Sequence, residues 1–321
     1  MLRTRFIRAA FAVASLLFVA TCTASEDCAA GNPLMPVCAV PASASVPQMV
    51  VLRAWDSTWT RADVYAMNPD GTNPRRLTTD GMQTQKMTPS QPVWSPDGRR
   101  IAFARRADNS TIRSQIHVMD EDGRNLQNIS NQTTAFDWSP TWSPDGRRIA
   151  FQSDRHSPAT SVCCNTSIYV MNADGSDVVR LTHNGNDKLP RWSPDGSTIV
   201  FNSTRASVAN QVFVMNADGS NLRQLTTAGT NRRAVWSADG TMIAFEGTRD
   251  PVAGGMGSGI YVMKADGSDQ MLVGQGLAML MSPGWSTDGS QIFFCGARTS
   301  AGKMHVFAVG MGGGEVRQVS D

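Results

Sequence analysis

An arginine recurs at one position of a repeated pattern, four residues after the phenylalanine of an apolar Ile-Ala-Phe-like triplet. It is found as Arg155, Arg205, Arg249 and Arg298. Guanidinium groups bind carboxylates and phosphates through forked pairs of N–H donors, so a ring of such arginines would recognise an anionic ligand or an acidic protein patch. The structural alternative is that each arginine pairs with an acid of a nearby loop, such as Asp137 or Asp187. Both interpretations are compatible with the sequence.

Two tryptophans, Trp55 and Trp59, stand outside the repeated pattern. Their large, partly polar rings can stack on a sugar or pack against a protein. Together with the arginines, they are our candidate residues for binding a ligand or a partner.

Catalytic constellations are sparse. The histidines show no second ligand at metal-binding spacing, and no Gly-x-Ser-x-Gly elbow occurs. The 17 methionines invite a copper-site hypothesis. Five of them occupy one equivalent place of the repeat, however, and are expected to pack in the core: Met67, Met119, Met171, Met215 and Met263. The sequence therefore predicts no metal, no cofactor and no catalytic set.

The composition is that of a globular chain. Of its 321 residues, 41% are hydrophobic and 17% are charged, and the net charge is +2. Lysine and arginine are spread along the chain rather than gathered in a basic stripe. No nucleic-acid partner is therefore expected.

The first residues read as an export signal. Three arginines precede an apolar run, residues 9–20, which is too short to span a bilayer. We assign residues 1–25 to a signal peptide and residues 26–37 to an N-terminal arm, which predicts a periplasmic protein. The residues before Cys22 resemble a lipobox. If Cys22 is lipidated, the protein is an outer-membrane lipoprotein facing the periplasm, and its lipid is the only membrane contact.

A sequence repeat positions the four arginines and the five methionines. The decapeptide WSPDGRRIAF occurs at 94–103 and again at 142–151, and the same frame begins at Trp192, Trp236 and Trp285. The copies continue with an Ile-Tyr-Val-Met-like segment, an Asp-Gly turn in all but the last copy, and a Leu-Thr-like segment. A divergent first copy has Ser43 in place of the tryptophan. Six copies therefore fill residues 38–321.

Each copy predicts four short strands. Ser-Pro-Asp-Gly and Asn-Ala-Asp-Gly form the tight turns, with glycine in the left-handed position. The Ile-Ala-Phe strand is apolar at every position, so both of its faces must be buried. The sequence therefore predicts an all-β fold, a six-bladed β-propeller of four-stranded antiparallel blades. A β-sandwich of unrelated hairpins does not explain a fixed order of motifs in six copies.

The predicted strands divide the ring into two faces. The short repeated turns lie on one face, and connections of variable length lie on the other. Binding residues concentrate on loops held by a rigid frame, so the variable face and the channel mouth there are the predicted site.

The disulfide pattern is left open by the sequence. An oxidising compartment permits disulfides. Cys28 and Cys38 are close enough to staple the arm, and the adjacent Cys163 and Cys164 can form a vicinal disulfide or staple their loop. A bond from that pair to Cys295 is disfavoured because the two segments belong to opposite blades. Five cysteines follow Cys22, and this odd count leaves one thiol free.

The motifs WSPDG, IAF, IYVMNADG and LT resemble the WD40-like PD40 repeat of the TolB family of periplasmic propellers. The resemblance covers the chain after residue 38 and implies a propeller with a scaffold role. TolB itself carries an α/β domain before its propeller. Only the arm 26–37 stands there in this sequence, so the contacts of that domain are not expected.

These observations together predict an exported, non-enzymatic propeller. Its partner would be an envelope protein or a cell-wall component bound by the variable face. The alternative is a propeller enzyme, a lyase or lactonase acting on an anionic sugar, with the arginines recognising carboxylates.

Overall fold

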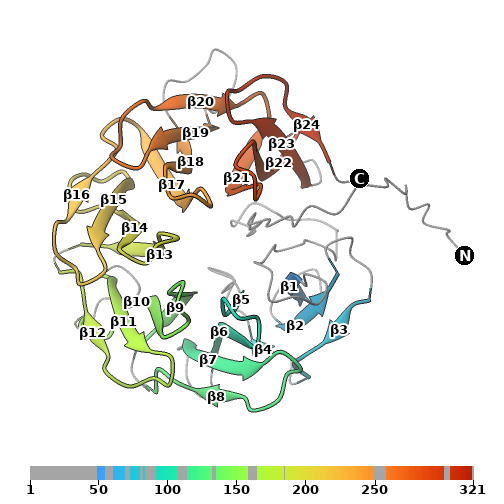
Figure 1. Ribbon diagram of the computed structural model, residues 1–321, viewed down its shortest axis with the longest axis vertical. Helices are drawn as coiled ribbons and strands as arrows, with labels where there is room; N and C mark the ends of the chain where they lie inside the picture. The colour runs from blue at the N-terminus through green and yellow to red at the C-terminus, as the bar shows by residue number, and fades with distance from the viewer. Residues whose placement is uncertain are drawn as a thin grey trace, which may run out of the picture.

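The computed structural model describes residues 49–54, 61–68, 73–79, 82–83, 92–106, 114–131, 135–157, 165–183, 185–248, 258–299 and 304–319. These residues form six antiparallel sheets of four strands, arranged as blades around one axis (Figure 1). The predicted six-bladed β-propeller is confirmed. Within this part of the chain, no helix is long and apolar enough to cross a membrane.

Blades 2 to 6 each contain four consecutive strands, which we call a to d from the axis outward. Blade 2 is β5 (Val93–Trp94), β6 (Arg100–Arg106), β7 (Ser114–Asp120) and β8 (Gln127–Asn128). Blade 3 is β9 (Asp137–Trp142), β10 (Arg148–Ser153), β11 (Ser167–Asn172) and β12 (Val179–Arg180). Blade 4 is β13 (Asp187–Trp192), β14 (Thr198–Ser203), β15 (Gln211–Asn216) and β16 (Arg223–Gln224).

Blades 5 and 6 repeat this order. Blade 5 is β17 (Thr230–Trp236), β18 (Met242–Thr248), β19 (Ser258–Lys264) and β20 (Met271–Gly274). Blade 6 is β21 (Met279–Trp285), β22 (Gln291–Ala297), β23 (His305–Gly310) and β24 (Arg317–Gln318).

Blade 1 differs in its fourth strand. It contains β1 (Met49–Ala54), β2 (Arg61–Met67), β3 (Arg75–Arg76) and β4 (Met82–Gln83). Both β3 and β4 pair with β2, so the outer strand is split in two. The inner strand predicted around Ser43 lies outside the described residues.

The Ser-Pro-Asp-Gly turn forms as predicted. In blade 3, Ser143 Oγ donates to Asp145 Oδ1 at 2.5 Å and accepts the amide of Arg148 at 2.9 Å. Gly146 closes the turn at φ +68°, a conformation that glycine adopts without steric cost. Each a–b connection consequently has the same length: 95–99, 143–147, 193–197, 237–241 and 286–290.

Strand b is buried on both faces, which explains its unbroken apolar sequence. In β10, Ile149 and Phe151 pack with blade 2, whereas Ala150 packs with blade 4. All three side chains are fully buried. The repeat methionines are packing residues as well, since Met119, Met171, Met215 and Met263 each lie in a different inter-blade cluster.

Strand a contains an irregularity that the sequence pattern did not indicate. The residue three positions before the repeat tryptophan has a left-handed backbone, at Ser139, Leu189, Arg233 and Ser282. The register to strand b shifts at the same place in all four blades. This bulge bends the innermost strand beside the axis.

Candidate functional site

The two faces of the ring differ as predicted. The variable face carries the b–c connections, which run from the six residues 55–60 to the longest, 154–166. The opposite face, which we call the turn face, carries the uniform a–b turns. The b–c connection of blade 4, residues 204–210, contains the fully exposed Val208.

Two of the repeat arginines are held inside their own blades. Arg155 Nη2 lies 3.1 Å from both oxygens of Asp137, and Arg205 Nη2 lies 2.6 Å from Asp187 Oδ2. Both aspartates are fully buried, and the arginine side chains are only 9% and 17% exposed. Burial raises the pKa of Asp137, and the guanidinium of Arg155 opposes that rise. These guanidinium groups are therefore engaged in intra-blade ion pairs.

Aromatic rings pack against the repeat arginines that the structure describes. The Arg155 guanidinium carbon lies 5.0 Å and 4.9 Å from the ring centres of Phe151 and Tyr169. Arg298 lies 5.6 Å from the ring centre of Phe307 in blade 6. This cation–π contact ties the end of strand b to strand c.

The remaining candidates fall outside the described residues. They are Arg249, Trp55, Trp59, Cys22, Cys28, Cys38, Cys163 and Cys164. Their proposed roles stay predictions.

The starts of three neighbouring inner strands bring together residues that the sequence analysis did not select. Trp138, Lys188 and Arg232 occupy equivalent positions of β9, β13 and β17, four residues before the repeat tryptophan. We call them the axial triad. β13 contacts both β9 and β17 beside the axis (Figure 1). Arg232 is exposed, and the other two residues are partly exposed.

The axial triad is positively charged. Among the described residues, neither Lys188 nor Arg232 forms an ion pair. The adjacent Arg233 does, because its Nη1 lies 2.7 Å from Glu246 Oε2. Arg191, also on β13, donates to the carbonyl of Pro190, and burial lowers its pKa to about 10, which leaves it protonated at neutral pH. The inner strands of blades 4 and 5 thus carry an excess of cations.

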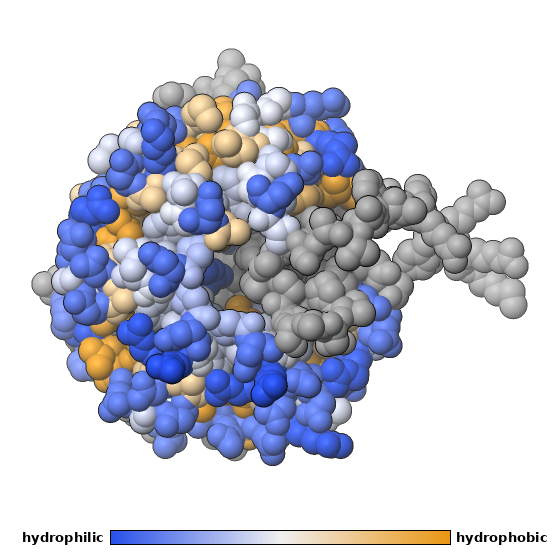
Figure 2. Space-filling model, viewed as in Figure 1, coloured by the Kyte–Doolittle hydropathy of each residue, from blue (hydrophilic) through white to orange (hydrophobic). Residues whose placement is uncertain are grey.

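Trp138 adds an aromatic surface on β9, the strand that contacts β13, which carries Lys188. Its ring stacks on buried Phe136 at a centroid distance of 4.8 Å and an interplanar angle of 2°. The viewed face of the molecule is largely hydrophilic and is hollowed at its centre (Figure 2). An aromatic ring beside two cations can bind an anion that carries an apolar portion.

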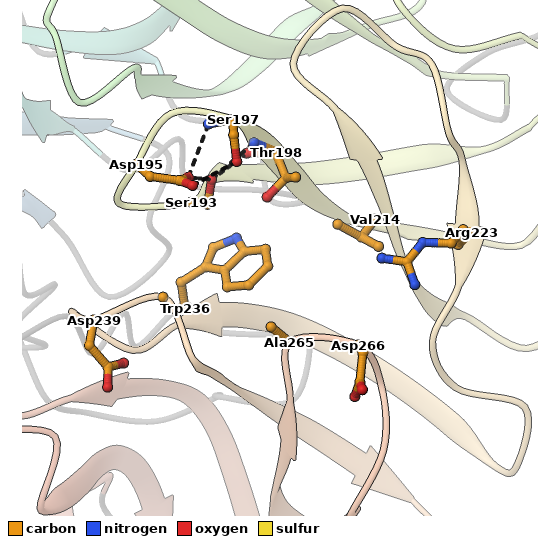
Figure 3. A pocket seen from close by; sticks show the side chains of 11 residues that line it. Ser193, Asp195, Ser197, Thr198, Val214, Arg223, Trp236, Asp239, Ala265 and Asp266 are labelled. Carbon is orange, nitrogen blue, oxygen red and sulfur yellow. Dashed lines mark hydrogen bonds between the residues drawn. The ribbon is translucent and has the colours of Figure 1, made fainter.

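A cavity of about 350 Å³ lies on the turn face between blades 4 and 5. Asp195, Asp239 and Asp266 are among its lining residues, with Trp236 in the middle of the group and Arg223 at its edge (Figure 3). Each carboxylate already accepts hydrogen bonds inside its own turn, such as those from Ser193 Oγ at 2.5 Å and the Ser197 amide at 3.0 Å to Asp195. These bonds lower the pKa of all three aspartates. The repeat's turn chemistry accounts for this acidic lining.

Two of the described histidines contact aromatic residues of their own blades. His117 is buried on β7 and stacks on Phe103, while His156 bonds to the Tyr169 hydroxyl. Burial lowers the pKa of both imidazoles, that of His117 to about 4. No group of three or more His, Cys, Asp or Glu side chains placed to hold a metal ion occurs among the described residues.

Comparison with known proteins defines the class of this chain. The family described as PD40, TolB beta propeller domain, matches residues 81–161 and 159–256. These segments cover more than half of the 321 residues, and the chain belongs to this TolB propeller family. A search of curated proteins found none that matches it.

Solved structures share the fold. TolB from Acinetobacter baumannii is 22% identical with a TM-score of 0.62, over 84% of this chain and 65% of that one. A putative TolB from Agrobacterium tumefaciens is 21% identical with a TM-score of 0.56, over 85% and 87%. An oligogalacturonate lyase from Vibrio parahaemolyticus is 14% identical with a TM-score of 0.60, over 95% and 79%. This chain thus spans less than two thirds of the first protein. At these identities the likeness shows the fold alone.

Proposed function

We propose that this chain is an exported scaffold propeller of the bacterial envelope, which binds an acidic protein partner at the axial end of its variable face. The axial triad is the observation that supports this function most. Carboxylates of the partner would pair with Lys188 and Arg232, and an apolar side chain would pack on Trp138. Tryptophan and arginine are the residue types that most often dominate protein–protein binding energy.

The export signal predicted in residues 1–25 supports a partner in the periplasm. The matched family supports a periplasmic scaffold. Anchoring through a lipid on Cys22 is part of the same proposal and concerns only how the protein is retained.

An anionic sugar is the second candidate ligand. Its carboxylates would meet the same two cations, and its ring would stack on Trp138. Structural neighbours that are oligogalacturonate lyases favour this alternative. The protein would then be a propeller lyase or lactonase.

Photo-crosslinking in living cells distinguishes the two candidates. A photoreactive residue would replace Val208 or the exposed Ala206, and the control would replace Val179, which is 53% exposed on outer strand β12. Arg205 is unsuitable because its ion pair holds the blade. We expect one protein adduct from both variable-face probes and none from Val179, identified by mass spectrometry.

Charge reversal tests the role of the axial triad. Lys188→Glu together with Arg232→Glu should abolish the adduct formed at Val208. Arg124→Glu, at an 83% exposed arginine between β7 and β8, should leave it unchanged. An equal adduct from Val179, or one that survives the double reversal, would contradict this site. If no probe yields an adduct, binding of oligogalacturonate by the purified protein becomes the measurement that decides for the sugar.

A further inference from the structure

Cys295 on β22 is fully buried and forms a disulfide. The described part of the chain holds no second cysteine. Its partner is therefore one of Cys22, Cys28, Cys38, Cys163 and Cys164. The position of Cys295 in the ring and the repetition of the blades discriminate among these five.

Cys295 lies on the face of blade 6 that closes the ring. The side chains of β22 alternate, and Ile292 and Phe294 pack against blade 5. Phe293 and Cys295 point to the opposite face of the sheet, where Cys295 packs with Met281. In a ring of six blades that face is the one turned toward blade 1 (Figure 1).

The described sheets do not share strands across this junction. Blade 1 contains β1 to β4 and blade 6 contains β21 to β24, so neither sheet combines the two ends of the described chain. Main-chain hydrogen bonds within a sheet therefore do not tie the described first and last blades together. A disulfide at Cys295 would link the two blades covalently at the junction where sheet hydrogen bonds do not connect them.

The equivalent position in other blades shows what Cys295 faces. That position is one residue after the strand-b phenylalanine, and blade 4 carries Asn202 there. The amide of Asn202 spans to the inner strand of the next blade, where Nδ2 donates to the Asn231 carbonyl at 3.2 Å and Oδ1 accepts the Arg233 amide at 2.9 Å. In blade 3, Gln152 accepts the Leu189 amide of blade 4 at 3.3 Å, which is the equivalent of the contact between Asn202 and Arg233.

Transferring this contact to the closing junction selects one cysteine. Asn231 lies five residues before Trp236, and Ser43 stands at the tryptophan position of the first repeat. The residue five positions before Ser43 is Cys38. We propose that Cys38 and Cys295 form a disulfide that closes the propeller ring. Cys163 and Cys164 come between β10 and β11 in the sequence, and the blade of these strands stands across the ring from blade 6 (Figure 1). Cys22 and Cys28 precede the repeat frame.

The chemistry is thiol–disulfide exchange with a protein disulfide of the oxidising compartment. The Cys38 thiolate attacks that disulfide and displaces one of its thiolates. The Cys295 thiolate then attacks the mixed disulfide, which forms the Cys38–Cys295 bond and releases the oxidant as a dithiol. Two electrons and two protons pass from the pair to the oxidant, so the step balances.

Peptide mapping tests the pairing directly. The mature protein, purified under oxidising conditions, is alkylated and digested without reduction by trypsin and chymotrypsin, which cleave after Leu34 between Cys28 and Cys38. We expect a peptide pair linking Cys38 to Cys295 that disappears on reduction. A bond from Cys295 to any other cysteine, or alkylated Cys295, would overturn the proposal.

Thermal melts test the role of the bond. Cys38→Ser should lower the melting temperature on the order of 10 °C, because the bond closes a very long loop. A reducing agent should lower the wild-type melting temperature equally and have no further effect on Cys38→Ser. Cys28→Ser is the matched control and should melt like the wild type. A wild-type melting temperature that does not respond to reduction, although the bond is shown to be cleaved, would refute a closing function.

Discussion

Arg205 and Asp187 illustrate how a repeated charged residue can serve the fold instead of a ligand. The aspartate is fully buried, so its charge must be compensated within the protein. The arginine supplies that charge at 2.6 Å and lays its planar group near Phe201 and Phe213. Two charges that would be costly to bury singly are thereby stabilised as a pair at the end of strand b.

Removal of this aspartate should therefore destabilise blade 4. Asp187→Ala leaves the Arg205 guanidinium partly buried without its carboxylate, and we expect a loss of about 3 kcal/mol in the free energy of unfolding. Urea denaturation followed by tryptophan fluorescence measures it. Arg124→Ala, on the turn face, should change the free energy by less than about 0.5 kcal/mol. Similar losses in both variants would show that the pair has no special role.

His117 should make the stability depend on pH. Burial, opposed by a contact with the Gln115 carbonyl and aided by the charge of Arg105, lowers its pKa from 6.5 to about 4. The folded protein thus keeps the imidazole neutral while the unfolded chain protonates it. Stability is full above pH 6.5 and falls as the pH drops toward 4, by up to about 3 kcal/mol.

A repeat-guided variant isolates this effect. Phe213 and Phe307 stack on the strand-b phenylalanines of blades 4 and 6 where His117 does in blade 2. His117→Phe should therefore keep the packing and lose part of the pH dependence. Denaturant midpoints of both proteins at pH 4.5 and 7 supply the test. Parallel pH profiles would mean that His117 does not titrate in this range.

The a–b turn and the bulged inner strand are the elements that set the geometry of each blade. The turn is encoded locally, because serine, proline, aspartate and glycine each satisfy one backbone requirement. The bulge at Leu189 or Arg233 has no comparable signature. The amide of the bulge residue donates to a side chain of the preceding blade, such as Asn202. The contact that stabilises the bulge therefore comes from another repeat.

Gly146 tests the local encoding of the turn. A Cβ added there would approach only Pro96 Cδ, at 3.7 Å, which is ordinary contact. The effect of substitution is therefore purely conformational. Gly146→Val should lose about 2 kcal/mol of stability, while Gly146→Asn, which tolerates positive φ, should lose less than about 1 kcal/mol. Equal thermal melts for the two variants would disprove the turn's requirement for a left-handed residue.

For the molecule as a whole, the repeat made the architecture predictable, since five of the six copies carry a Ser-x-Asp-Gly turn followed by the same doubly buried strand. Phe151 and Gly146 could be placed for that reason. The axial triad could not be predicted, because Trp138, Lys188 and Arg232 differ in type and lie on neighbouring strands only once the blades are arranged in a ring. Its members come from three blades, and no local pattern marks the position. The split outer strand of blade 1 could not be predicted either, because it departs from the repeat.

The sheet order has a consequence for how the chain is made. Each blade is complete once its own stretch of chain has been synthesised, so blades can fold one after another and lay each new face on the previous one. Until the last blade appears, the growing arc has apolar faces at both ends and remains open to chaperones and proteases. The rate at which the final repeat is synthesised therefore sets how long the two end faces of the arc stay exposed.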